Sequence, residues 1–103
     1  MPGGQSEWLT QYQFEGALGR HYRAALRRDP SDHLAQFNLA LVLEEQGRAD
    51  EAIHAYHAAL RASPDFADAH YNLGLLFDSL GKRSQAMTHL RTARKLYGRP
   101  TRN

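Results

Sequence analysis

The sequence repeats itself with a period of 34 residues. Pro30 and Pro64 are separated by this distance, and so are Gly47 and Gly81. Further positions keep the same register: Asn38-Leu39 with Asn72-Leu73, Ala52 with Ala86, Tyr22 with Tyr56 and Leu90, and Ala25 with Ala59 and Ala93. Self-similarity at a fixed period indicates a repeat architecture, in which each unit buries its apolar face against the next unit.

Each period contains two segments in which apolar residues recur at helical spacing, and this predicts two helices per period. Gly47 and Gly81 are expected to end the first helix of each pair, because glycine adopts the left-handed conformation without strain. Pro64 closes the period, because proline has no N–H group with which to continue a helix. The second helices are expected to begin at Asp50 and Ser84, which are good N-cap residues.

Gly74 lies in the middle of a helical segment, where glycine costs about 1 kcal/mol relative to alanine. The repeat register pairs Gly74 with Ala86, and it pairs Ala40 with Ala52 one period earlier. We therefore predict that two antiparallel helices cross closely at these small residues.

The N-terminal part, residues 1–30, fits the period only in its second half. Leu18 occupies a position where the repeat requires a small residue, and the chain before it is too short for a complete first helix. We predict a flexible segment over residues 1–5 and then a half-repeat over residues 6–30. This half-repeat is one long helix or a helix bent near Gly16.

These matches resemble the tetratricopeptide repeat (TPR) family, whose pattern is a bulky residue, Leu-Gly, an aromatic residue, and then Ala, an aromatic residue, Ala and Pro. The matching residues are Phe37, Leu39, Ala40, Leu43, Ala52, Tyr56, Ala59 and Pro64, followed by Tyr71, Leu73, Gly74, Phe77, Ala86, Leu90 and Ala93. The resemblance implies an all-α fold, a right-handed helical-hairpin solenoid of about five helices. After the half-repeat it places full repeats at 31–64 and 65–98, followed by a basic tail at 99–103.

The resemblance also implies a protein–protein interaction module, in which the first helices of successive repeats line a concave groove for a peptide or a partner helix. By the family's pattern the groove positions here are Leu34, Phe37, Asn38, Leu41, Glu44, Glu45, Asp68, Tyr71, Asn72, Leu75, Asp78 and Ser79. They are apolar and aromatic with an acidic rim, so the expected partner carries basic and apolar side chains. Asn38 and Asn72 are candidates for hydrogen bonds to a peptide backbone. The lysine with which some TPR proteins bind a C-terminal carboxylate is replaced by Phe37, so the resemblance does not imply that activity for this chain.

The net charge of +2 conceals a strong segregation of charge along the chain. Residues 31–81 contain eight acidic and two basic residues, whereas residues 82–103 contain no acidic residue. The basic residues of this last segment are Lys82, Arg83, Arg91, Arg94, Lys95, Arg99 and Arg102. They leave two alternatives open: binding of nucleic acid or another acidic surface, and self-assembly into a homodimer with the basic tail in a neighbour's acidic groove. Nucleic acid is the less favoured, because Tyr97 is the one aromatic residue interleaved with these charges.

The sequence gives no support for an enzyme. The absence of cysteine excludes disulfides, zinc–thiolate sites and cysteine nucleophiles, and no nucleophile-elbow, phosphate-loop or metalloprotease motif is present. His54 and His57 have a spacing that suits two metal ligands, but no third ligand follows on the same helix face. We therefore predict no cofactor, no metal and no small-molecule substrate. The lack of a signal-peptide pattern and of an apolar run of about 20 residues predicts a cytoplasmic protein that does not enter membranes.

Overall fold

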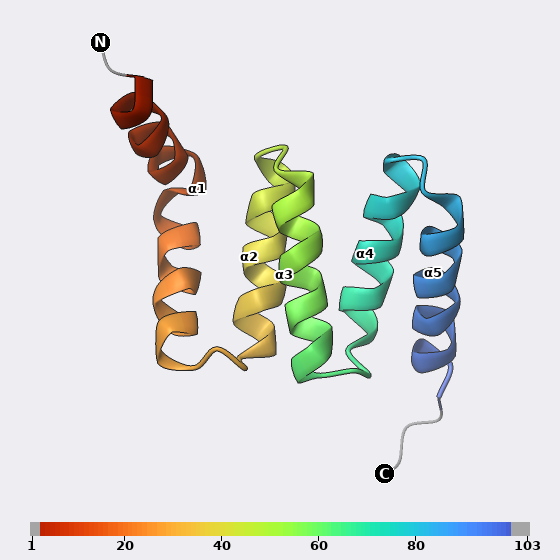
Figure 1. The fold of residues 1–103 in the computed structure, drawn as a ribbon. Coiled ribbons are helices and arrows are strands. Elements are labelled where there is room, and N and C mark those ends of the chain that lie inside the picture. The colour runs from red at the N-terminus through yellow and green to blue at the C-terminus, as the bar shows by residue number, and fades with distance from the viewer. Residues whose placement is uncertain (1–2, 100–103) are drawn as a thin grey trace.

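The computed structural model describes the backbone of residues 3–99 and the side chains of residues 16–99. This part of the chain forms five helices and no strand: α1 (Gly3–Arg28), α2 (His33–Glu45), α3 (Ala49–Ala62), α4 (Ala67–Ser79) and α5 (Arg83–Tyr97). The helices lie in a row and alternate in direction (Figure 1). The most extensive contacts join α2 to α3 and α4 to α5, and these pairs form two antiparallel hairpins. The predicted all-α hairpin solenoid is confirmed.

The turns inside the two hairpins are built identically around glycine. Gly47 and Gly81 have φ angles of 74° and 76°, in the left-handed region where side chains with a Cβ are strained. After Gly47 the N–H of Arg48 donates to the carbonyl of Leu43 over 2.9 Å, and the same bond recurs 34 residues later. These bonds satisfy the last carbonyls of α2 and α4, so the predicted helix ends at glycine are confirmed.

The prediction of N-caps at Asp50 and Ser84 is wrong. The caps of α3 and α5 are Arg48 and Lys82, because the second helix starts immediately after the glycine turn. Neither cap residue accepts a hydrogen bond through its side chain. At α3 the Arg48 guanidinium instead donates to both carboxylate oxygens of Glu51, over 2.9 and 2.7 Å, and this ion pair spans the first turn.

Small residues allow the two helices of each hairpin to cross closely. A Cβ placed on Gly74 would lie 2.7 Å from Cγ of Leu90 and 3.3 Å from the carbonyl oxygen of Ala86, so a larger residue does not fit without movement. In the first hairpin Ala40 and Ala52 occupy the equivalent places and are completely buried. The close crossing predicted from the glycine is confirmed.

The N-terminal helix α1 packs on α2 through its C-terminal half, where Tyr22 and Leu26 lie against the core. It bends at Gly16, whose φ of 64° and ψ of −166° are not helical, which confirms the bent form of the expected helix. Leu18 is 61% exposed, because α1 has no preceding hairpin partner among the described residues to cover it. The first residues of the predicted flexible segment, and Arg102 in the basic tail, lie outside the described residues.

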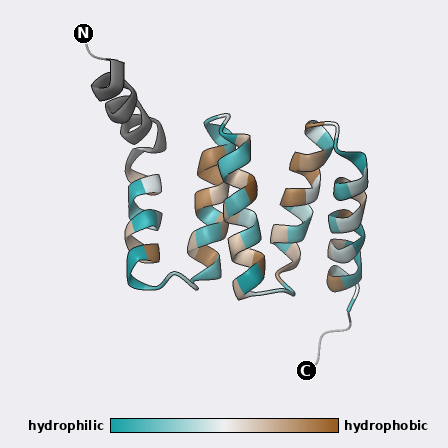
Figure 2. Cartoon of the chain, viewed as in Figure 1, coloured by the Kyte–Doolittle hydropathy of each residue, from teal (hydrophilic) through white to brown (hydrophobic). Residues whose placement is uncertain are grey.

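The hydrophobic residues are distributed unequally among the helices. Figure 2 shows them gathered on α2 and α4, while α5 and the coloured part of α1 are mostly hydrophilic. The first helix of each hairpin therefore has apolar side chains that the core does not bury, in addition to those that it does. This uneven distribution makes the exposed sides of α2 and α4 the natural place to look for a binding site.

Candidate functional site

The predicted groove residues of α2 divide into an exposed set and a half-buried set. Leu34, Leu41 and Glu45 are exposed, whereas Phe37, Asn38 and Glu44 are half-buried. Leu34 has 55% of its surface exposed and Leu41 has 38%. Only part of the predicted α2 set is thus open to a partner.

Phe37 contributes to packing between the two hairpins. Its ring meets Tyr56 edge-on, with the centroids 5.9 Å apart, and lies 4.9 Å from the ring of Phe66. Phe66 is the residue that caps the start of α4. Phe37 therefore joins α2 to the beginning of the next repeat, a role that the groove pattern did not predict.

Glu44 and Asn72 converge on the buried Tyr56. The hydroxyl of Tyr56 donates a hydrogen bond of 2.5 Å to Oε2 of Glu44, and the side chain of Asn72 on α4 also reaches this hydroxyl. Burial, and then the hydrogen bond and charge of Glu44, raise the pKa of Tyr56 far above its ordinary value, while Asn72 acts in the opposite direction. Tyr56 thus stays protonated and connects three helices, so Glu44 and Asn72 have a structural role in addition to any contact with a partner.

The predicted groove residues of α4 are more open. Asp68, Tyr71, Leu75, Asp78 and Ser79 are all exposed, and Tyr71 and Leu75 each have 44% of their surface accessible. Because α2 and α4 are first helices in the same repeat register, their exposed residues occupy the same side of the row. We call Leu34, Leu41, Glu45, Asp68, Tyr71, Leu75 and Asp78 together the α2/α4 face.

The end of α5 reaches the beginning of α4 and borders this face. The hydroxyl of Tyr97 donates to Oδ1 of Asp68, and its ring lies edge-on to Tyr71 with the centroids 6.4 Å apart. The hydrogen bond to Asp68 raises the pKa of Tyr97 to about 12. Arg99 forms an ion pair of 3.3 Å with Asp65, so this member of the predicted basic set is paired.

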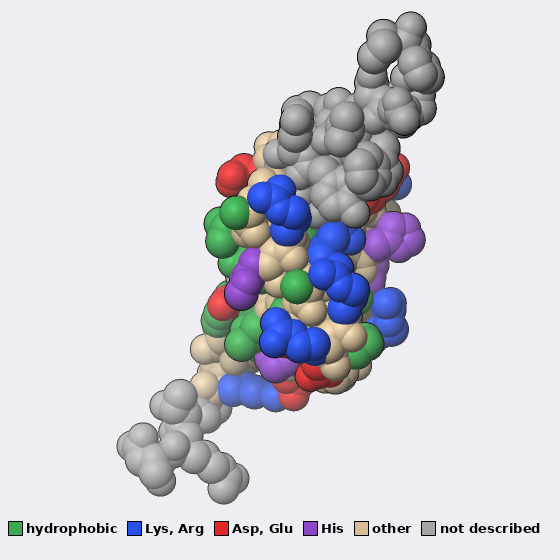
Figure 3. Space-filling view, turned by 90° about the vertical axis from the view of Figure 1, so that its left-hand side faces the viewer, with side chains coloured by type: hydrophobic (Ala, Val, Ile, Leu, Met, Phe, Trp, Pro, Cys, Tyr) green, Lys and Arg blue, Asp and Glu red, His purple; other side chains and the backbone are tan. Residues whose placement is uncertain are grey.

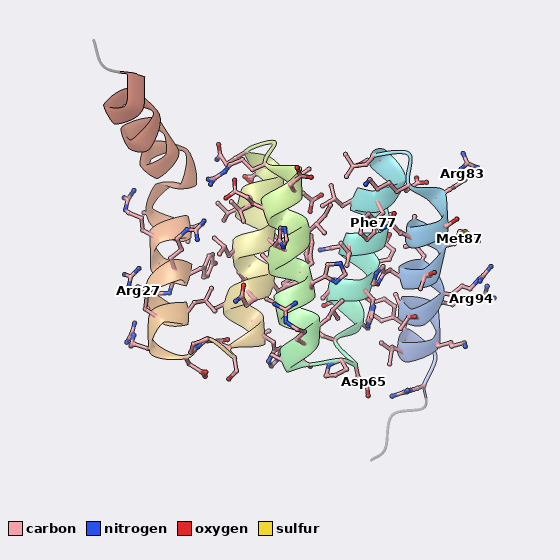
Figure 4. The ribbon with its side chains drawn as sticks, viewed as in Figure 1. Arg27, Asp65, Phe77, Arg83, Met87 and Arg94 are labelled. Carbon is pink, nitrogen blue, oxygen red and sulfur yellow. The ribbon has the colours of Figure 1, made fainter. Side chains whose placement is uncertain are left out.

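The other described members of the basic set lie exposed on α5 and the turn before it: Lys82, Arg83, Arg91, Arg94 and Lys95. In Figure 4, Arg83, Met87 and Arg94 point away from the rest of the molecule along the outer side of α5. The residues of α3 at the corresponding repeat positions are apolar and pack on the core: Ala49, Ile53 and Leu60. The outer side of α5 is therefore basic where the same side of α3 is apolar.

Basic side chains also gather on the α1 side of the molecule (Figure 3).

Three histidines meet across the two hairpins, although no sequence pattern relates them. His57 of α3, His70 of α4 and His89 of α5 form a connected set of ring contacts. His54, the expected companion of His57, is exposed. Among the described residues no group of three or more His, Asp or Glu side chains has the geometry to hold a metal ion. The sequence spacings of 13 and 19 residues follow neither the helical period nor the repeat, so no signal could have identified this cluster.

None of the helices in the described part of the chain combines the length and the apolar character that crossing a bilayer requires.

Comparison with known proteins places the chain in a family of helical repeats. A TPR repeat model matches residues 44–81, and tetratricopeptide repeat models match residues 13–56 and 68–99. No curated protein shows a significant sequence match.

Solved structures of MamA have the same fold. The crystal structure of MamA is 23% identical with a TM-score of 0.77, and the match covers 91% of this chain and 54% of that one. The structures MamA MSR-1 and MamA AMB-1 are 25% and 24% identical, with TM-scores of 0.69 and 0.71. The two matches cover 74% and 78% of this chain, and each covers 44% of the matched MamA chain. The chain thus corresponds to about half the length of these MamA chains.

Repeats of this kind typically serve as scaffolds for protein–protein interaction without enzymatic activity, and the matches support an interaction module of that type. Taken together, the three family matches run from residue 13 to residue 99, and the chain belongs to the tetratricopeptide repeat family.

Proposed function

We propose that this protein is an adaptor that binds a peptide or a partner helix on the α2/α4 face, with no catalytic role and no small-molecule substrate. The observation that carries the proposal is the exposure of four large apolar side chains on the first helices of the two hairpins: Leu34, Leu41, Tyr71 and Leu75. Complete burial of such a side chain is worth about 1.5–3 kcal/mol relative to exposure, so a partner that covers them gains affinity. A cluster of apolar side chains on a surface is typical of an interaction site.

The charge of the face determines the kind of partner. Glu45, Asp68 and Asp78 are exposed acidic residues that flank the apolar side chains. A partner with lysine or arginine beside apolar anchors complements this pattern, and opposite charge speeds association as well as favouring the correct partner. Asn38, half-buried on α2, is our candidate for a hydrogen bond to the backbone of the partner.

The proposal is tested with a short synthetic peptide of lysine and leucine residues, compared with a peptide in which glutamate replaces each lysine. Isothermal titration calorimetry is expected to show binding of the lysine peptide only. Leu75→Ser should weaken this binding about tenfold, since loss of an interface anchor costs on the order of 1.4 kcal/mol.

Met87→Ser is the matched control, because Met87 is 47% exposed but lies on the outer side of α5. It should leave the affinity unchanged. Equal binding of both peptides, or equal effects of the two substitutions, would show that the α2/α4 face is not the binding site.

The basic outer side of α5 supports a second candidate function, self-assembly. The exposed residues Arg83, Arg91 and Arg94 complement the acidic α2/α4 face of a second copy, which would make the chain a homodimer. Nucleic acid is less well supported as the partner, because the ring of Tyr97 packs against Tyr71 and its hydroxyl is bonded to Asp68.

Light-scattering mass at low and high salt tests the homodimer, because exposed charge pairs are screened by salt. The dimer should dissociate at high salt, and Arg91→Glu together with Arg94→Glu should give a monomer at low salt. A monomer of the unchanged protein at both salt concentrations would exclude self-assembly.

A further inference from the structure

Three histidine rings lie at the junction between the two hairpins. His70 and His89 stack with their centroids 5.3 Å apart and their Nδ1 atoms 3.1 Å apart. His57 lies edge-on to His89 at 5.8 Å. Phe77 of α4 packs on two of these rings, with its centroid 5.7 Å from that of His89 and 6.4 Å from that of His57. One imidazole from each of α3, α4 and α5 thus contributes to a single aromatic cluster, which we call the histidine junction.

The hydrogen bonds fix which ring nitrogens carry protons. Nε2 of His70 lies 2.9 Å from the carbonyl oxygen of Pro64, which can only accept, so this nitrogen carries a proton. In the neutral ring Nδ1 of His70 is then an acceptor, and Nδ1 of His89 donates to it. A second proton on His70 keeps this bond only if the proton of His89 lies on its Nε2, because protons on both Nδ1 atoms would place two N–H donors opposite each other at 3.1 Å. The stacked pair can therefore hold one proton between its two Nδ1 atoms but not two.

The surroundings disfavour positive charge on the other two rings. Burial, and then the charges of Arg61 and His54 on α3 and of His70 on α4, lower the pKa of His57. Burial, and then His70 and His57, lower the pKa of His89. Among the described residues the charged groups that act on these two rings are thus all basic, and no carboxylate compensates a proton gained there.

The direction of the pH effect follows from these lowered values. In the unfolded chain the same histidines titrate near their ordinary pKa of 6.5, so below that pH the unfolded state binds more protons than the folded state. The stabilisation by neutral packing is complete above pH 6.5 and is lost as the pH falls below it.

The position of the cluster determines what its protonation would change. The contact between α3 and α4 is less extensive than the contacts inside the two hairpins. In a repeat protein each unit is held by its own packing and by the interface with its neighbour. His57 lies in this thin interface and contacts His89 and Phe77 across it, so charge on His57 or His89 should separate the two hairpins before it disrupts the first of them.

We propose that the histidine junction is a proton-sensitive contact that holds the α4–α5 hairpin against α3 at neutral pH and releases it at mildly acidic pH. Release changes the position of α4 relative to α2, and so takes apart the α2/α4 face; this consequence rests on the proposed function. The protein would then bind its partner at neutral pH and release it in acidified surroundings.

Thermal unfolding at pH 7.5 and pH 5.5, with a chelator present to exclude adventitious metal, tests the contact itself. The melting temperature of the unchanged protein should fall by about 5–10 °C between these conditions, because even a small loss in the free energy of unfolding lowers the melting temperature of a small domain by several degrees. The double variant His57→Gln, His89→Gln has no titrating group in the pair of rings that joins the two hairpins, and it should lose less than half as much. His21→Gln, an exposed histidine on α1, is the control and should behave like the unchanged protein.

NMR titration of the histidine rings tests the proposal without any substitution. We expect His57 and His89 to titrate below 6.5 and the amide signals around Phe66 and Asn72 to shift with them. Titration of both rings at 6.5 or above, or an equal fall in melting temperature for the unchanged protein and the double variant, would overturn the proposal.

Binding of the lysine–leucine peptide at the two pH values separates this inference from the proposed function. Affinity should drop at least tenfold at pH 5.5 for the unchanged protein and less for the double variant. Absence of binding at pH 7.5 would contradict the proposed function, whereas the melting and NMR results would still decide whether the junction responds to protons.

Discussion

The hydroxyl of Tyr56 donates a hydrogen bond of 2.5 Å to Oε2 of Glu44 and thereby ties α3 to α2 inside the first hairpin. The second hairpin has no equivalent bond, because the residues 34 positions later are Leu90 and Asp78, and leucine has no donor. Asp78 is accordingly exposed. The two repeats therefore use the same acidic position differently, one for internal structure and one on the surface.

Removal of the Tyr56 hydroxyl should destabilise the protein. Tyr56→Phe leaves the half-buried carboxylate of Glu44 without its donor, and we expect a loss of about 1–2 kcal/mol in the free energy of unfolding. Urea unfolding measures it. Tyr22→Phe is the matched control, since Tyr22 holds the same repeat position in α1, and it should change stability by less than about 0.5 kcal/mol. Equal losses for the two variants would contradict a specific role of the bond to Glu44.

Gly74→Ala should destabilise the protein although alanine favours helices. The gain in helix propensity is about 1 kcal/mol, but the new Cβ would meet Cγ of Leu90 at 2.7 Å and the backbone at Ala86 at 3.3 Å. Overpacking of this kind costs about 1–3 kcal/mol, so we expect a net loss of about 1 kcal/mol.

A double-mutant cycle with Leu90→Ala shows whether the clash is the cause. Truncation of Leu90 removes the atoms nearest to the new Cβ, so the two substitutions together should cost less than the sum of their separate costs. Strict additivity would mean that Gly74 is not required by the close approach of α5.

Gly47→Ala should cost about 1–2 kcal/mol for a purely conformational reason. Its φ of 74° strains any residue with a Cβ, whereas the space around it is open, with no atom within 4 Å of an added Cβ. Gly47→Asn should cost less, because asparagine tolerates the left-handed conformation. Chemical denaturation of both variants gives the comparison, and an equal cost would argue against conformational strain as the cause.

The bond between Tyr97 and Asp68 should be visible in the ionisation of tyrosine. The hydrogen bond to Asp68 raises the pKa of Tyr97 to about 12, so any stability that it contributes is complete below the ordinary value of 10 and is lost as the pH rises through 12. Asp68→Ala removes the acceptor, so spectrophotometric titration of this variant should show the pKa of one tyrosine returning towards 10. An unchanged titration curve would show that the bond does not persist in solution.

The architecture of this protein was determined by local features that the sequence displays directly. Helical spacing of apolar residues, glycines with left-handed φ at Gly47 and Gly81, and small residues at Gly74 and Ala86 each act within one hairpin, and each recurs with the period. The start of the second helices was missed by two residues, because Arg48 and Lys82 are held by backbone bonds of the glycine turn and need no capping side chain.

Only the tertiary structure decided which groove positions are open and which are used internally. Phe37, Glu44 and Asn72 fit the periodic pattern of a binding surface, yet their partners come from neighbouring helices and include the buried Tyr56. The histidine junction likewise depends on contacts between three helices. A sequence period indicates which face of a helix a residue lies on. The partner of a long polar or aromatic side chain depends instead on how closely successive repeats stack, because that distance decides which side chains come within contact, and the sequence does not display it.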